Sequence, residues 1–140
     1  MNRIIGLLII GLGLSLSNCG NNAQLVQGSI EQTSWQLVKM PTKMPKETVF
    51  KIAFEAGTLV GKGPCNRYHA TYYASEGTFN ISGGIGRTQE ECPASGPLEK
   101  DFYNYLHSTT TFGYKGEQLV MRSDLGDLVF ESIPFTTNLD

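Results

Sequence analysis

Apolar side chains recur at every second position along much of this chain, in short runs that are separated by glycine, proline and asparagine. The clearest run is residues 50–55, in which Phe50, Ile52 and Phe54 alternate with lysine, alanine and glutamate. A period of two is typical of strands that have one face in the core and the other in water. The pattern therefore predicts a mostly β domain made of short antiparallel strands.

Turn sequences divide the chain into hairpins. Ala56-Gly57 is expected to join residues 50–55 to a partner strand over residues 58–63, and a turn at 75–77 joins 65–74 to 78–82. Gly83 and Gly84 are expected to interrupt the ladder before a short extended segment over residues 85–88. The other expected strands are one around Trp35 and Leu37 and three over residues 110–114, 118–122 and 128–131.

One helix is predicted. It starts near Gly96, because Pro97 suits the first helical position and Glu99 suits the first turn, where backbone N–H groups lack partners. It is expected to end near His107, since a run of β-branched threonines follows. The side chains expected on its apolar face are Leu98, Phe102, Tyr105 and Leu106.

The predicted fold class is α+β, mostly β: a curved antiparallel sheet or partial barrel of about six to eight strands, with one helix packed across it. A chain of 140 residues has material for one hydrophobic core. We expect that core in a domain over residues 32–133, followed by a frayed tail over residues 134–140.

Residues 1–18 have the pattern of a signal peptide. Arg3 precedes an apolar run over residues 4–16, and small and polar residues follow. That run is shorter than the roughly twenty apolar residues that a transmembrane helix needs. The sequence Leu16-Ser17-Asn18-Cys19 resembles the lipobox of bacterial lipoproteins, in which the cysteine is acylated and becomes the new N-terminus. Residues 19–31 would then be a lipidated N-terminus and a flexible tether.

Two alternatives to lipidation stay open. Asn18 departs from the small residue that usually precedes the lipobox cysteine, and cleavage after Ser17 would instead release a soluble, secreted protein. An uncleaved membrane anchor is the second alternative. With lipidation, the expected location is the bacterial cell envelope, with the protein anchored by its lipid and facing the periplasm if the organism has an outer membrane.

The cysteines divide into one lipidation site and one pair. With Cys19 acylated, Cys65 and Cys92 remain in an oxidising compartment, and a disulfide between them is expected. Two buried free thiols or a metal site are the alternatives. Only His69 and His107 could complete a zinc site, and their spacing is not that of a zinc motif. We therefore expect no metal and no cofactor.

Charge and motif spacing argue against nucleic-acid binding and catalysis. The formal net charge of −2 gives no basic footprint for nucleic acid. Residues 57–63 lack the spacing of a phosphate-binding loop. His69 lies in a tyrosine-rich strand and His107 at a helix end, so neither is expected to serve as a catalytic base. The adjacent Glu90 and Glu91 are expected in a solvated loop.

An ordered set of short motifs spans nearly the whole chain after the tether. Together these motifs, in this order and at these spacings, resemble the META/HslJ domain family. Pro64 departs from the glycine that the family usually has before Cys-Asn, and a proline cannot adopt a positive φ there. The motifs are Trp35-x-Leu37, Gly61-x-Gly63-x-Cys65-Asn66, Thr88-x-x-x-Cys92, Glu99-x-x-Phe102-x-x-x-Leu106, Leu119 and the strand at 128–130.

The resemblance implies a small envelope or secreted protein, often a lipoprotein, associated with heat shock, drug tolerance or virulence and without catalytic activity. It makes Trp35, Asn66, Thr88, Glu99 and Phe102 a framework motif. Taken by itself, an asparagine in a turn is expected to bond backbone groups two residues on.

The expected function is that of a non-enzymatic envelope lipoprotein in stress tolerance or envelope maintenance. The alternative is a binding module for a hydrophobic ligand or for a protein partner such as a protease or a secretion component. We expect a monomer that contacts the membrane through its N-terminal lipid and binds no nucleic acid.

Overall fold

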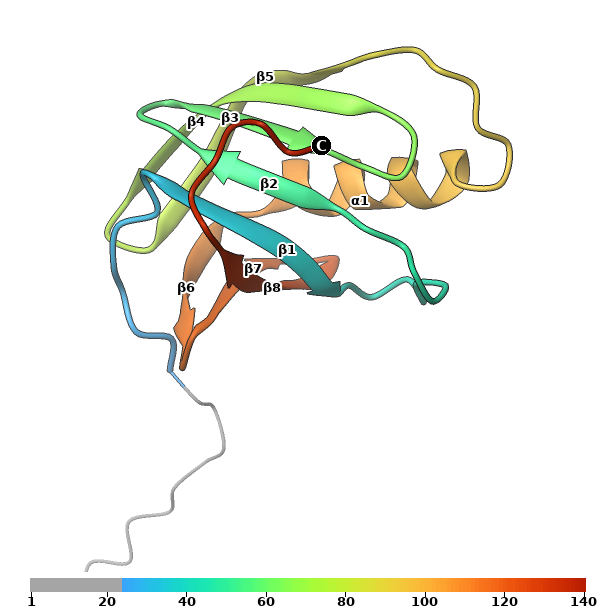
Figure 1. Cartoon of the computed structure of the whole chain (residues 1–140). Helices are drawn as coiled ribbons and strands as arrows, with labels where there is room; N and C mark the ends of the chain where they lie inside the picture. The colour runs from blue at the N-terminus through green and yellow to red at the C-terminus, as the bar shows by residue number, and fades with distance from the viewer. Residues whose placement is uncertain (1–23) are drawn as a thin grey trace, which may run out of the picture.

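Eight antiparallel strands close into a barrel in chain order in the computed structural model, which describes residues 24–140 (Figure 1). The mostly β fold with a single helix, α1 (Gly96–Ser108), confirms the predicted fold class. The predicted signal peptide and Cys19 lie outside the described residues. The strands are β1 (Thr33–Lys39), β2 (Lys51–Phe54), β3 (Thr58–Lys62), β4 (Arg67–Ser75), β5 (Thr78–Arg87), β6 (Thr111–Lys115), β7 (Gln118–Ser123) and β8 (Gly126–Ile133).

The two-residue period of the sequence places alternate side chains inside and outside the barrel. In β4, Tyr68 and Tyr72 are buried, whereas Tyr73 is 64% exposed, because successive strand residues point to opposite faces. The interior is filled by close-packed side chains rather than left hollow. The largest fully buried ones are Phe50, Phe54, Phe79, Phe102, Phe130, Ile30, Ile52, Leu59, Leu106, Leu119, Met121 and Leu128.

The helix lies where two neighbouring barrel strands have the least backbone pairing with each other. β5 and β6 share a single residue pair, Thr78 with Thr111, and α1 connects these two strands and packs against β5, β7 and β8. Phe102 is fully buried on the helix, with its ring 4.5 Å from that of Phe50. The helix therefore covers the core beside β5 and β6, where these strands share only one residue pair.

The buried face of α1 differs in part from the predicted one. Leu98 and Tyr105 are only half-buried, and Tyr103 and Glu99 are buried in their place. The buried positions 99, 102, 103 and 106 follow the i, i+3, i+4, i+7 spacing of one helix face. The sequence placed Glu99 in the first turn of the helix but not on its buried face, and burial of a carboxylate requires hydrogen-bond partners.

Gly83 and Gly84 form a bulge and do not interrupt the ladder. β5 is continuous, and its register against β4 shifts so that residues 83–85 stand opposite Ala70. Gly83 has a φ of 77°, a conformation that glycine adopts without steric penalty. The expected break is thus a local irregularity within one long strand.

Both segments that were predicted to be flexible contact the barrel where the structure describes them. Val26 exchanges backbone hydrogen bonds of 2.9 and 2.8 Å with Tyr114, and Ile30 is buried in the core. In the C-terminal tail, Leu139 is only 2% exposed. The sequence prediction of a frayed tail is wrong, because Leu139 is buried against the barrel and Thr136 is hydrogen-bonded to Ser34.

Gly61 lies against the ring of Tyr68, its cross-strand partner. A Cβ at Gly61 would lie 1.9 Å from that ring, whose hydroxyl donates a 2.9 Å hydrogen bond to the Lys51 carbonyl. We expect Gly61→Ala to lower the free energy of unfolding by about 2 kcal/mol, because a packed core must move to admit the methyl group. Urea denaturation followed by circular dichroism measures this change.

Gly84→Ala is the matched control for this substitution. A Cβ at Gly84 meets nothing within 4 Å, so the free energy of unfolding should change by less than about 0.5 kcal/mol. Equal denaturation midpoints for the two variants would contradict the close approach at Gly61.

Candidate functional site

A buried carboxylate organises the motif residues at one end of the barrel. Glu99, in the first turn of α1, is 1% exposed. Its Oε1 accepts hydrogen bonds of 2.8 Å from the backbone N–H groups of Cys65 and Asn66. Its Oε2 accepts a 2.9 Å hydrogen bond from Asn66 Nδ2. The helix is thereby fastened to the loop between β3 and β4.

Asn66 links a third segment to this network. Its Oδ1 accepts hydrogen bonds from the Thr88 hydroxyl at 2.9 Å and from the Glu90 backbone N–H at 2.8 Å. The side chain therefore does not bond its own turn, as its local sequence suggested, but residues 22 to 33 positions away. A local signal could not identify these partners because the fold alone brings them together.

The disulfide between Cys65 and Cys92 is present, as predicted, with a Cα–Cα distance of 6.0 Å. It joins the same two loops that Asn66 joins. Gly63 is required beside it, since a Cβ there would lie 2.3 Å from Glu99 Oε1. Pro64 is exposed and not in this close contact, so the departure from the usual glycine leaves the network intact.

Two buried tyrosines lie next to the network and remain protonated at neutral pH. Burial, and then the Glu99 charge, raises the pKa of Tyr103, whose hydroxyl is 3.4 Å from Glu99 Oε2. The Arg87 guanidinium lies 5.4 Å from the centre of the same ring. Burial likewise raises the pKa of Tyr68 well above its ordinary value. Both phenols act as hydrogen-bond donors and are poorly suited to act as bases.

The remaining predicted residues are spread over the barrel. Trp35 is buried in β1 and donates a 2.7 Å hydrogen bond to the Thr33 hydroxyl. His69 is exposed on β4, and His107 Nε2 lies 3.0 Å from the Gly83 carbonyl oxygen. Residues 24–140 contain no group of three or more His, Cys, Asp or Glu side chains that could hold a metal ion. The helix described here is too short or too polar to cross a membrane.

The Glu99 network is therefore a structural fastening. Both carboxylate oxygens already accept hydrogen bonds. The donors of the shortest bonds belong to the loop between β3 and β4, which the fold holds in place. Only 1% of Glu99 is exposed, so its oxygens are directed at the loops rather than at solvent. The arrangement fixes the geometry of two loops relative to the first turn of α1.

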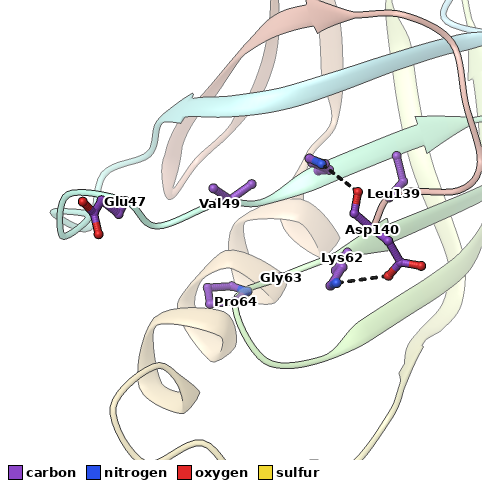
Figure 2. A pocket seen from close by; sticks show the side chains of 8 residues that line it. Glu47, Val49, Lys62, Gly63, Pro64, Leu139 and Asp140 are labelled. Carbon is purple, nitrogen blue, oxygen red and sulfur yellow. Dashed lines mark hydrogen bonds and ion pairs between the residues drawn. The ribbon is translucent and has the colours of Figure 1, made fainter.

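A surface pocket of about 360 Å³ lies on the outside of the barrel, beside the C-terminal tail (Figure 2). Lys51, Lys62, Leu139 and Asp140 are among its lining residues. Lys62 Nζ is 3.1 Å from Asp140 Oδ1, and its hydrogen bond lowers the pKa of that carboxyl. Sequence reasoning missed this site because it expected the tail to be frayed.

The META domain family model matches residues 28–132, more than half of the chain. The chain belongs to the META domain family. This META domain is similar to a Burkholderia xenovorans protein solved by NMR, with a TM-score of 0.62 and 20% identity, over 81% of this chain and 97% of that one. It is also similar to a DUF4847 family protein from Bacteroides vulgatus, with a TM-score of 0.57 and 15% identity, over 73% and 93% of the two chains.

These identities show that the META domain fold is shared and carry no further information about function. No functionally curated protein has significant sequence similarity to this META domain. Arguments about its function therefore depend on its own residues.

Proposed function

We propose that this META domain protein is a non-enzymatic lipoprotein of the cell envelope that acts in stress tolerance or envelope maintenance. The observation that carries the proposal is the Cys65–Cys92 disulfide, because disulfides form and persist outside the reducing cytoplasm. The lipobox-like sequence ending at Cys19 supports a lipid anchor, although that residue lies outside the described part of the chain.

The non-enzymatic part of the proposal is supported by the site geometry. The buried carboxylate of Glu99 is committed to loop hydrogen bonds, and the two histidines lie on different elements. The META domain is not a known enzyme family. A buried polar network whose members are all hydrogen-bonded makes the domain rigid, which suits a protein of the cell envelope.

A protein-binding module is the second candidate function. The barrel interior is filled by aromatic rings such as Phe54 and Phe130, which have no exposed surface. That packing disfavours a hydrophobic ligand inside the barrel and favours a partner on its outer face. The pocket beside the tail is such an outer surface.

Intact-mass analysis of the purified membrane fraction tests the proposal. The chain should begin at Cys19, carry acyl chains and lack the two thiol hydrogens of Cys65 and Cys92. Cys19→Ser should abolish acylation and remove the protein from the lipid-anchored fraction. An unprocessed chain with three free thiols would overturn the envelope location.

A deletion strain tests the physiological part. It should lose tolerance of heat or of envelope-directed drugs, and the wild-type chain should restore tolerance better than the Cys19→Ser variant. Unaltered tolerance under both stresses would count against stress protection while leaving the envelope location standing.

A further inference from the structure

Three cations stand side by side on the outer face of β2, β3 and β4. Lys51 is the cross-strand partner of Lys62, and Lys62 is the partner of Arg67. Like charges directly opposite each other destabilise a sheet unless a counter-charge is present. This cationic row is therefore expected to hold an anion.

Asp140 supplies the anion. Its Oδ1 lies 3.1 Å from Lys62 Nζ (Figure 2). The same oxygen pairs with Arg67, and Lys51 Nζ donates a 3.4 Å hydrogen bond to the Asp140 backbone oxygen. Asp140 thus contacts all three strands, β3 and β4 through its side-chain carboxylate and β2 through its backbone oxygen. Its side chain remains 59% exposed, so solvent and competing anions reach these ion pairs.

A row of small side chains, two of them apolar, lies next to the cations; we call it the apolar row. Ser34, Ala53 and Val60 are consecutive cross-strand partners on β1, β2 and β3, on the outer face of the barrel. Ala53 nonetheless has no exposed surface, and Val60 and Leu139 line a common pocket of about 470 Å³. An outward-facing residue is buried here because chain outside the barrel covers it.

The covering chain is the C-terminal tail. Figure 1 shows it leaving β8 and crossing β1 and β2 toward β3. Ser34 Oγ donates a 2.9 Å hydrogen bond to the Thr136 carbonyl and accepts a 3.0 Å hydrogen bond from the Thr136 N–H. Leu139 lies at the apolar row and Asp140 at the cationic row. Residues 136–140 thus lie across the strands as a bound peptide would.

We propose that this surface is a docking site for an acidic peptide segment, with an apolar side chain directly before an aspartate, and that residues 136–140 occupy it in cis. We call it the tail site and define it by Lys51, Lys62, Arg67, Ala53 and Val60. Two adjacent rows of different chemistry select a polypeptide, because an apolar side chain and a carboxylate on consecutive residues fill both. Binding at the tail site does not require lipidation of Cys19.

The tail is held weakly enough to be exchanged. Exposed ion pairs contribute little and are screened by salt. A tethered segment competes at an effective concentration in about the millimolar range, so a partner peptide binds detectably only when the tail is released. The test therefore compares the intact chain with a chain whose tail cannot dock.

The tail-release variant is the full chain carrying Leu139→Gly and Asp140→Asn. The probe is a fluorescent synthetic peptide with the sequence of residues 134–140, and its binding is measured by fluorescence anisotropy. We expect the variant to bind the peptide at least about tenfold more tightly than the intact chain, and more weakly as salt increases. A peptide with asparagine in place of its final aspartate should lose about three- to tenfold in affinity, because it lacks the two exposed ion pairs.

Substitutions in the cationic row locate the binding. Adding Lys62→Gln and Arg67→Gln to the tail-release variant should weaken peptide binding by about three- to tenfold. The matched control, Lys100→Gln and Lys115→Gln, removes the same charge from exposed positions outside the row and should leave the affinity unchanged. Equal loss in both would reduce the effect to overall charge and overturn the tail site.

Hydrogen exchange of the intact chain gives a second measurement that needs no tail variant. Lys62→Gln and Arg67→Gln should speed amide exchange in residues 136–140 and leave the barrel strands protected. Unchanged exchange in the tail would overturn the proposal.

Three other outcomes would also overturn the proposal. The first is a folded tail-release variant that fails to bind the peptide. The second is a concentration-dependent dimer of the intact chain that the variant loses, which would indicate tail exchange between two copies. The third is sedimentation of the variant with phosphatidylglycerol vesicles without peptide binding, which would assign the cationic row to a membrane surface.

Discussion

Glu99→Ala should lower the free energy of unfolding by about 4 kcal/mol, because it leaves four donors without their acceptor. Those donors are the backbone N–H groups of Cys65 and Asn66, the side-chain amide of Asn66 and the Tyr103 hydroxyl. Each buried, unsatisfied donor costs roughly 1 to 3 kcal/mol, and water that enters the site recovers part of this. Urea denaturation at neutral pH measures the loss.

Two controls separate the hydrogen bonds from the charge. Glu99→Gln retains one acceptor oxygen but turns an amide donor toward other donors, so about half of the loss is expected. Glu91→Ala removes a carboxylate from an exposed position nearby and should change the free energy of unfolding by less than about 0.5 kcal/mol. If Glu99→Ala were as stable as Glu91→Ala, the network would not fasten the helix to the loops.

Loss of the disulfide should lower the free energy of unfolding by about 3 to 4 kcal/mol. Cys65 and Cys92 are 27 positions apart, and the chain-entropy argument gives this magnitude for a loop of that length. The double substitution Cys65→Ala and Cys92→Ala avoids a free thiol that could form an incorrect disulfide. Urea denaturation with and without a reductant measures the effect.

The reductant supplies the control. It should destabilise the wild-type chain by about the same amount as the double substitution and leave the substituted chain unaffected. A loss below about 1 kcal/mol would mean that the hydrogen bonds of Asn66 already hold the two loops together. Combining the double substitution with Glu99→Ala should give a non-additive loss, because both changes act on the loop that contains Cys65.

These two predictions concern residues that the family motif identified, although the motif did not indicate what they contact. The resemblance singled out Asn66, Thr88 and Glu99, and the structure brings all three into one hydrogen-bonded cluster. Tyr103 joins the cluster although no motif includes it. Its helical spacing of four residues from Glu99 is the signal that could have found it, once Glu99 was known to be buried.

The tail site is a second feature that the sequence did not reveal. Lys51, Lys62 and Arg67 are ordinary surface cations in the sequence, and only the register of three strands aligns them. Leu139 is the single apolar residue among residues 136–140, and local pattern assigns this stretch to a frayed end. Its burial depends on a slot that residues from other strands create.

Local pattern by itself determined the strands, the hairpins and the helix, because alternation, turn residues and helix-end preferences act over a few neighbouring positions. The number of cysteines and the expected compartment determined the disulfide pair. Tertiary structure alone decided that the sheet closes into a barrel, that Glu99 is buried and that the tail binds across the strands. Each of these outcomes balances a desolvation cost against partners far away in the chain. Those partners exist only after the chain has folded, so no short stretch of sequence contains them.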